Sequence, residues 1–176
     1  MESILALDNN NGLSNHGLIP WKSQKDMQFF FKKTINNVVI MGKKTYFSLP
    51  EKSRPLKDRL NIVLTSNPDY FIFKNESSKY ENVLFTKYTQ IYNTILNDRE
   101  KYLNTYPSLS RNFKIYIIGG KQIYETFFPL CQTIWLTQIK QNYMCDLVFE
   151  YNFEKEFKEE VYYENDELKI IEYNRI

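Results

Sequence analysis

The stretch VVIMGKKTYFS, residues 38–48, places an apolar run, a glycine and a helix-compatible segment in direct succession. The run VVIM has the length and the β-branched content of a buried strand, and Gly42 ends it. A short helix is predicted to follow over residues 43–49. FKIYIIGG (113–120) repeats the arrangement, because a second apolar strand there runs into two glycines. Strand-to-helix junctions of this kind are typical of α/β sheets.

The rest of the chain continues the alternation of strands and helices. NPDY (67–70) is predicted to be a turn, and a polar segment follows it. The C-terminal residues predict an antiparallel hairpin, with EEVYY and KIIEY on either side of ENDE. The remaining predicted elements are strands at 2–7, 61–66, 82–85 and 133–139, a loop at 8–17, and helices at 24–35, 88–103 and 121–128.

We therefore predict one α/β domain over residues 1–176, built on a central, mostly parallel eight-stranded sheet. The C-terminal hairpin adds antiparallel strands, and about four helices flank the sheet. The chain has 25% charged and 43% hydrophobic residues, which is an ordinary globular composition, and its length suits a single core.

Charge and targeting signals exclude several classes of partner. The net charge of +2 is too near neutrality to predict a nucleic-acid partner. No apolar run is long enough to span a membrane, and MESILALD lacks the features of a signal peptide. Cys131 and Cys145 form no CxxC motif, so two reduced thiols are preferred over a disulfide or a metal pair. We expect a cytoplasmic protein without membrane or nucleic-acid partners.

His16 is the only histidine, and it lies in a loop rich in glycine and asparagine. A histidine-based catalytic triad or a zinc cluster is therefore not expected, and no metal is predicted. If the protein is an enzyme, its proton chemistry runs through a carboxylate, a hydroxyl or water.

The stretch DMQFFFKKT (26–34) places Asp26 ahead of three phenylalanines. The simpler explanation is that acids are favoured in the first turn of a helix and face solvent there. In the alternative, Asp26 turns toward an apolar pocket with Met27 and Phe30, where its charge needs hydrogen-bond donors. A ligand with two adjacent N–H donors on an amidine-like edge would supply them. Taken alone, Asp26 favours the simpler explanation.

Two strand-to-helix junctions are candidate phosphate sites. MGKKT (41–45) is not a Walker A loop, because Val38 and Lys43 stand where glycines are required. Helix amides and lysines can still hold an anion there, although solvated lysines are the commoner outcome. Gly119 and Gly120 do not fit the GxGxxG fingerprint. The pair indicates either pyrophosphate contact or unusual backbone geometry.

Taken in order, these pieces resemble dihydrofolate reductase over nearly the whole chain. The motifs are LALD (5–8) with NGLSNHGLIPW (11–21), DMQFFFKKT, VIMGKKTYFSLPEKSRPLKDRLNIVLTS (39–66), IYIIGGKQIYETFFP (115–129), IWLTQI (134–139) and CDLVF (145–149). The resemblance implies reduction of 7,8-dihydrofolate to 5,6,7,8-tetrahydrofolate with NADPH as cofactor. It also implies a cytoplasmic monomer that supports thymidylate, purine and one-carbon metabolism and is a target of antifolates.

The resemblance assigns catalytic roles to four residues. Asp26 matches the carboxylate that binds the pterin N3–H and 2-amino group, and Thr137 matches the threonine that hydrogen-bonds this carboxylate. Trp21 matches the residue that holds an ordered water, and Tyr124 is expected near pterin and nicotinamide. The hydride goes to C6, water entering near the 13–20 loop protonates N5, and Asp26 polarises the ring. An Asp with its ordinary pKa would be ionised at neutral pH.

The resemblance also implies two sets of binding residues. Arg59 matches the arginine that clasps the glutamate α-carboxylate of folate, and core packing is the simpler explanation for the apolar residues of the substrate set. Lys43 with Ser66 is expected to favour the 2′-phosphate of NADPH. The substrate set is Ile4, Leu5, Ala6, Asp26, Met27, Phe30, Ser48, Leu49, Leu56, Arg59, Ile118 and Thr137. The cofactor set is Ala6, Leu13, Asn15, Leu18, Gly42, Lys43, Lys44, Thr45, Leu64, Thr65, Ser66, Ile118, Gly119, Gly120, Lys121, Gln122, Ile123 and Tyr124.

The family pattern further implies a cis peptide between Gly119 and Gly120, and Arg54-Pro55 is a second cis candidate. The chain departs from the pattern at Ser14, Gln122, Leu147 and Glu150, which bears on loop motion and cofactor affinity. Two alternatives stay open. One is the reductase of riboflavin biosynthesis on the same fold, and the other is a non-catalytic folate-binding module.

Overall fold

The apolar runs of the sequence form the strands of one large sheet in the structure, a computed structural model that describes residues 1–73 and 81–176. The strands are β1 (Glu2–Leu7), β2 (Gly12–Ser14), β3 (Val38–Gly42), β4 (Leu60–Leu64), β5 (Val83–Thr86), β6 (Ile115–Ile117), β7 (Thr133–Ile139), β8 (Leu147–Val148), β9 (Phe157–Glu164) and β10 (Leu168–Arg175). The α-helices are α1 (Gln24–Thr34), α2 (Lys43–Ser48), α3 (Pro68–Phe73), α5 (Ile91–Asn97), α6 (Arg99–Thr105) and α7 (Lys121–Phe127).

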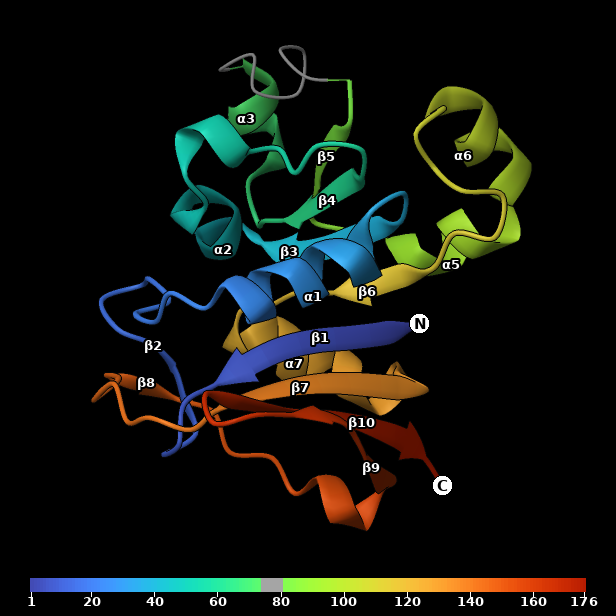
Figure 1. The fold of residues 1–176 in the computed structure, drawn as a ribbon. Coiled ribbons are helices and arrows are strands. Elements are labelled where there is room, and N and C mark those ends of the chain that lie inside the picture. The colour runs from blue at the N-terminus through green and yellow to red at the C-terminus, as the bar shows by residue number, and fades with distance from the viewer. Residues whose placement is uncertain (74–80) are drawn as a thin grey trace. The chain divides into compact units, whose positions relative to one another are not determined.

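The large sheet has eight strands in the order β5-β4-β3-β6-β1-β7-β10-β9 (Figure 1). Strands β3, β4 and β5 are parallel neighbours, and β1 is parallel to β7. The C-terminal hairpin is antiparallel, since β10 pairs with both β7 and β9. The predicted fold class is therefore confirmed.

Contacts between Cα atoms divide the chain into two compact units. One comprises Met1–Lys32 with Ile117–Ile176, and the other comprises Lys33–Tyr116. The single domain predicted from the sequence stays a prediction.

In the unit Lys33–Tyr116, the core forms around parallel strands that are apolar on both faces. The side chains of Val38, Val39, Ile40 and Met41 have no exposed surface, and Tyr46 of α2 is equally buried. Continuous burial is characteristic of parallel strands covered on both sides. The short helix α2 begins directly after Gly42, as the sequence predicts.

In the unit built from both chain ends, alternation along β7 separates two sheet faces. Thr137 lies on one face, and Leu136 and Gln138 lie on the opposite one, because successive side chains of a strand alternate. The outer strand β9 carries a run of exposed residues from Lys158 to Tyr162. Several of them are charged, which discourages pairing of the open edge with another chain.

Three segments differ from the sequence predictions. The helix expected over residues 88–103 is divided into α5 and α6, because Asp98 leaves helical geometry at φ −124° and ψ 47°. A helix begins at Pro68 where a turn was predicted, and proline is favoured at a first helical position. These short helices bring the described α-helices to six, compared with about four expected.

Two further predictions concern the loops. The loop expected over residues 8–17 contains the strand β2, which pairs with β8 in a separate two-stranded sheet. The polar stretch of residues 74–80 lies outside the described residues. Within the described ranges, no helix combines the length and the apolar character that a membrane crossing requires.

Candidate active site

Asp26 stands in the first turn of α1, at a helix start that is built by Ser23. The Ser23 hydroxyl accepts a 3.2 Å hydrogen bond from the Asp26 backbone amide, and the Ser23 carbonyl accepts one from Met27 at 3.1 Å. Ser23 is buried, so this cap is shielded from water. A capped helix start fixes the direction in which the Asp26 side chain leaves the backbone.

The pKa of Asp26 lies above its ordinary value, and burial of the carboxyl group is the main cause. Thr137 and Trp21 act in the opposite direction as neighbouring donors, and the charge of Glu167 adds to the upward shift. The expectation of an Asp with an ordinary pKa is thereby corrected. Near neutral pH, the protonated form of Asp26 is therefore more populated than the protonated form of a free aspartate.

Two buried donor atoms face this carboxyl group without an ordinary hydrogen-bond partner. Trp21 and Thr137 are 5% and 1% exposed, and neither Trp21 Nε1 nor Thr137 Oγ1 has a partner in the described part of the chain. Both atoms affect the pKa of Asp26, although neither forms a hydrogen bond of standard geometry with it. Buried donors of this kind are rare in folded proteins and indicate a place for water or a ligand.

Tyr124 connects the double-glycine turn to β1. Its hydroxyl donates a 3.0 Å hydrogen bond to the carbonyl of Ile4, and burial raises the pKa of the phenol, which stays protonated. Gly119 packs against this ring with φ +104°, and a Cβ atom there would lie 2.9 Å from the ring atoms. The peptide Gly119-Gly120 is cis, and so is Arg54-Pro55, so both predicted cis bonds are confirmed.

The segment between β2 and Trp21 begins with a tight turn. Asn15 and Leu18 exchange backbone hydrogen bonds of 2.8 and 3.0 Å, and the two residues between them, His16 and Gly17, both have positive φ. Positive φ at both central residues defines the turn type that hairpins prefer. The His16 amide donates a 3.0 Å hydrogen bond to Asp146, which ties the turn to the segment before β8.

The side chain of Asp8 joins the same two segments, and the sequence analysis did not predict this role. Its carboxylate accepts hydrogen bonds from the backbone amides of Asn10, Gly12 and Tyr143 at 2.8, 2.7 and 2.9 Å. The Cys145 thiol lies 3.6 Å from the same carboxylate. Burial raises the pKa of Asp8, but the amide hydrogen bonds outweigh it and bring the pKa below its ordinary value. The available signal was the Asp-Asn-Asn-Asn-Gly turn, which begins with an acid.

In the unit Lys33–Tyr116, the carboxyl ends of β3 and β4 bring two predicted cofactor segments together. Gly42 pairs in register with Leu64, so the segments Gly42–Thr45 and Leu64–Ser66 leave the sheet at the same edge. Lys43 and Lys44 are exposed at the start of α2, while Thr65 is buried. Ligands of α/β sheets bind at this end of parallel strands.

Arg59 is buried in the same unit, and its surroundings fix it in place. Its Nε donates to the carbonyl of Lys57 at 2.9 Å, and its Nη1 donates to Thr34 Oγ1 at 3.0 Å. Burial lowers the pKa of the guanidinium, while the charge of Asp58 partly restores it. The side chain still remains a cation at any physiological pH, because the ordinary pKa of arginine lies far above that range.

Two asparagines hold the loop that carries Arg59, and sequence reasoning also missed them. The Leu56 amide donates to Asn61 Oδ1 at 2.9 Å, and Asn61 Nδ2 returns a bond to the Leu56 carbonyl at 2.9 Å. Asn82 Nδ2 donates to the carbonyls of Leu56 and Arg59, both at 3.1 Å. No local sequence signal marks these contacts, because Asn82 is remote from the loop in sequence.

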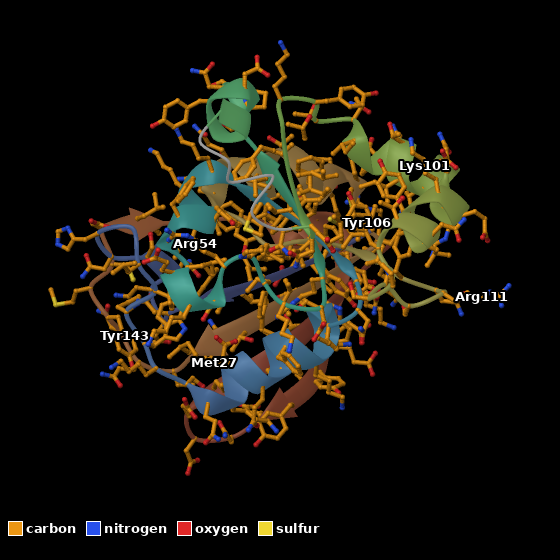
Figure 2. All side chains as sticks on the ribbon, turned by 90° about the horizontal axis from the view of Figure 1, so that it is seen from above. Met27, Arg54, Lys101, Tyr106, Arg111 and Tyr143 are labelled. Atoms are coloured by element: carbon orange, nitrogen blue, oxygen red, sulfur yellow. The ribbon has the colours of Figure 1, made fainter. Side chains whose placement is uncertain are left out.

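The other predicted residues are partly buried and partly exposed. Met27 is 70% exposed on α1 (Figure 2), and Leu18 is 56% exposed, so neither lies in a closed apolar wall. Tyr143, also labelled in Figure 2, packs edge-on against Trp21 at 5.7 Å. Buried predicted residues are Ile4, Leu5, Leu56, Leu64 and Ile118, and those of intermediate exposure are Ala6, Leu13, Asn15, Phe30, Gly42, Ser48, Leu49, Gly120, Lys121 and Ile123, while Gln122 is exposed.

Lys121 of α7 donates a 3.1 Å hydrogen bond to the carbonyl of Val148 in β8. No cluster of three or more metal-ligating side chains occurs among the residues described.

Comparisons with known proteins agree on one family. The family model described as dihydrofolate reductase matches residues 1–175. The dihydrofolate reductases of Aedes albopictus and Drosophila melanogaster are 31% and 32% identical over 155 residues, covering 83% of this chain and 76% of each relative. The bifunctional dihydrofolate reductase-thymidylate synthase of Zea mays is 33% identical over 152 residues, or 81% of this chain and 27% of that protein.

A solved structure also shares the fold. Dihydrofolate reductase from Enterococcus faecalis, complexed with NADP(H), superposes with a TM-score of 0.71 at 24% identity. The match covers 99% of this chain and 95% of that one.

Proposed function

Because this chain belongs to the dihydrofolate reductase family, we propose that Asp26, Trp21, Thr137 and Tyr124 carry its reduction of dihydrofolate. The enzyme is an NADPH-dependent oxidoreductase that converts 7,8-dihydrofolate to 5,6,7,8-tetrahydrofolate. The single observation that carries the residue assignment is a partly buried carboxyl group of raised pKa, faced by two buried donors that lack ordinary partners.

Asp26 binds the pterin through paired hydrogen bonds. Its carboxylate accepts from two adjacent N–H groups of the substrate, N3–H and the 2-amino group, and two parallel charge-assisted bonds fix the orientation of the ring. The raised pKa of Asp26 supports this role, because a cationic or strongly polarised partner recovers part of the cost of burying the charge. Thr137 donates its hydroxyl proton to the same carboxylate once the substrate orders it.

Trp21 positions the water that protonates N5. Its buried Nε1 donor has no partner in the described part of the chain, which suits a site for one ordered water molecule. The water reaches N5 from the side of the 13–20 loop. Asp26 stabilises the protonated ring electrostatically rather than transferring the proton itself.

Each unit, taken by itself, contains residues suited to hold a part of NADPH. In one unit, Gly119 leaves no room for a Cβ atom beside Tyr124, so only bare backbone lines this turn before α7. In the other, the exposed Lys43 and Lys44 stand at the edge where β3 and β4 end, next to Thr65 and Ser66. Bound NADPH supplies the hydride for C6. Gly119 to Ile123 hold its pyrophosphate, and Lys43 with Ser66 holds its 2′-phosphate.

Arg59 anchors the acidic tail of the substrate. Its guanidinium is held rigidly by Lys57 and Thr34, which suits a planar clasp for a carboxylate. The walls of the pterin site come from the apolar substrate residues named from the sequence, with Ile4 and Tyr124 joined by a hydrogen bond.

We infer a wider biological role by analogy with the family. The enzyme acts as a cytoplasmic monomer, supports thymidylate, purine and one-carbon metabolism, and binds antifolates in the substrate site. The alternatives, a riboflavin-pathway reductase and a non-catalytic folate-binding module, are not favoured by the family match over residues 1–175.

The test follows NADPH oxidation with dihydrofolate, with NADH measured in parallel. Turnover is expected with NADPH, with lower efficiency for NADH. The variant Asp26→Asn is expected to lose at least a hundredfold in kcat/KM, whereas Asp69→Asn, an acid in the first turn of α3, changes nothing. Normal turnover of Asp26→Asn at neutral pH would overturn the assignment of the pocket.

A further inference from the structure

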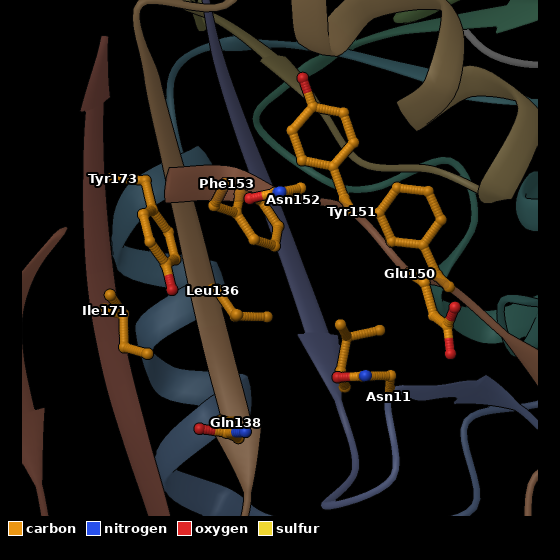
Figure 3. Close-up of a pocket in the computed structure, with 11 residues that line it drawn as sticks. Asn11, Leu136, Gln138, Glu150, Tyr151, Asn152, Phe153, Ile171 and Tyr173 are labelled. Carbon is orange, nitrogen blue, oxygen red and sulfur yellow. The ribbon is translucent and has the colours of Figure 1, made fainter. Parts of the chain in front are cut away.

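A cavity of about 440 Å³ opens on the face of β7 that points away from Thr137 (Figure 3). Leu136 and Gln138 flank Thr137 in the strand, so their side chains enter this cavity while Thr137 faces Asp26. The volume is within the range of small-molecule sites in proteins. All of its lining residues belong to the unit built from both chain ends.

Aromatic rings form the upper wall of the cavity. Phe153 and Tyr173 stack at 4.5 Å, and Phe149 and Tyr151 are nearly parallel at 6.3 Å. The hydroxyls of Tyr151 and Tyr173 donate to Glu156 and Glu159, both at 3.1 Å. These bonds hold the rings in place. Phe149, Phe153 and Tyr173 are buried and Tyr151 is partly exposed, so Tyr151 is the ring that an incoming planar group can contact.

Polar side chains without partners stand on the opposite side of the cavity, as Figure 3 shows for Gln138 and Asn11. Gln138 is half-buried, and its amide makes no hydrogen bond within the described ranges; the amides of Asn11 and Asn152 make none either. Each amide offers one donor group and one acceptor. Asn11 and Asn152 are exposed and Gln138 is half-buried, so these amides are reachable from solvent and can pair with a ligand.

The charge of the lining excludes the two known ligands of the enzyme. Glu150 is the only charged residue among the lining side chains, and no lysine, arginine or histidine contributes to the cavity. Dihydrofolate and NADPH are polyanions, so this lining repels them.

We propose that this cavity binds an uncharged planar heterocycle of nucleoside type. The ring lies against Tyr151, and its donor and acceptor edge pairs with Gln138 and Asn11, as amide side chains pair with adenine. The hydroxyls of the sugar donate to Glu150. The cavity contains none of the proposed catalytic residues, so this proposal does not depend on the proposed function.

Binding at this site touches both strands of the small sheet. The Phe149 amide donates a 2.9 Å hydrogen bond to the Asn11 carbonyl, directly beside the pairing of β2 with β8. A ligand between Asn11 and Glu150 therefore contacts the residue that precedes β2 and a residue that follows β8.

The test is titration of the full chain, saturated with NADPH, with adenosine and with adenosine monophosphate. Saturation keeps both probes out of the adenosine position of the cofactor. Adenosine is expected to shift the side-chain amide resonances of Gln138 and Asn11, and the monophosphate to bind at least fivefold more weakly because Glu150 repels it. In Glu150→Gln this difference is expected to shrink.

Two variants locate the site. Gln138→Leu is expected to weaken adenosine at least tenfold, and Asn11→Ala, on the exposed side of the cavity, gives a second measurement if the first variant unfolds. Gln132→Leu, an exposed glutamine outside the lining, serves as the control and binds like the parent. No adenosine binding, equal binding of both probes, or unchanged affinity in Gln138→Leu and Asn11→Ala would overturn the proposal.

Discussion

The fully buried carboxylate of Asp8 accepts a 2.7 Å hydrogen bond from the backbone amide of Gly12, across a turn whose middle residues are exposed. Its other oxygen accepts from Tyr143, so one side chain fixes both the segment that leads into β2 and the segment that leads into β8. The pairing of these two strands precedes the loop that ends at Trp21. The position of that loop therefore depends on an acid that touches neither substrate nor cofactor.

Replacing Asp8 with Ala removes the acceptor of one buried amide, that of Gly12, and of two partly buried amides, those of Asn10 and Tyr143. We expect a loss of about 2–3 kcal/mol in the free energy of unfolding and a lower kcat, measured by urea unfolding and by turnover. The pKa of Asp8 is lowered in the folded state, so its stabilising effect is present above the unfolded value of 3.8 and is lost as pH falls through the folded pKa. Equal stability of the variant and the parent at pH 7 would contradict this role.

A methyl group at Gly119 is expected to disturb the cofactor turn. The backbone there has φ +104°, and the added Cβ meets the Tyr124 ring at 2.9 Å. Gly119→Ala is expected to lose about 2–3 kcal/mol of stability and to raise KM for NADPH. Gly17→Ala is the matched control, because its φ is +77° but no atom lies within 4 Å of the added Cβ. That variant loses only about 1 kcal/mol, and its KM for NADPH is expected to rise less than that of Gly119→Ala.

The ionised form of Asp26 is expected to lower the free energy of unfolding, although the same carboxylate is needed for the reaction. Its pKa is raised in the folded state, so the folded protein binds this proton more tightly than the unfolded chain, and stability falls as pH rises through the folded pKa. Asp26→Asn is therefore expected to be more stable than the parent at pH 8, with a smaller difference at pH 4, near the unfolded pKa of 3.8. Urea unfolding at both pH values measures it, and a variant less stable at pH 8 would refute the burial argument.

Asn82 is expected to act on the substrate through the loop of Arg59. Asn82→Ala removes two 3.1 Å hydrogen bonds to the carbonyls of Leu56 and Arg59. We expect KM for dihydrofolate to rise about three- to tenfold, about 1 kcal/mol, with little change in kcat or in KM for NADPH. Asn93→Ala removes only an exposed bond to Gln90 and is the control. Equal effects on both substrates would indicate general loosening of the unit instead.

The sequence predicted those elements whose burial follows a local pattern. Strand β7 was expected at residues 133–139 and is found there, because an apolar run in this segment has the length of a buried strand. The hairpin of β9 and β10 was equally clear from its turn residues. The cis peptide at Gly119 and the roles of Asp26 and Thr137 came from family resemblance and not from local physics.

What the sequence could not show depends on contacts between distant residues. Strand β2 has only three residues and forms because β8 and the Asp8 turn hold it, which no local pattern reveals. The helix break at Asp98 was hidden by apolar spacing that suits one helix as well as two. The asparagine network around Leu56 was invisible for the same reason, since its members lie up to 26 residues apart.

The contact between Cys145 and Asp8 also determines how the protein behaves toward oxidants and alkylating reagents. Burial and the neighbouring acid raise the pKa of the Cys145 thiol to about 11, and burial raises that of Cys131 to about 12. Since the thiolate is the reactive species, both sulfurs remain almost entirely protonated at neutral pH. The two thiols of the folded enzyme should therefore resist oxidation by air and alkylation by maleimides. A newly introduced surface cysteine could then be labelled with a fluorophore without replacing Cys131 and Cys145.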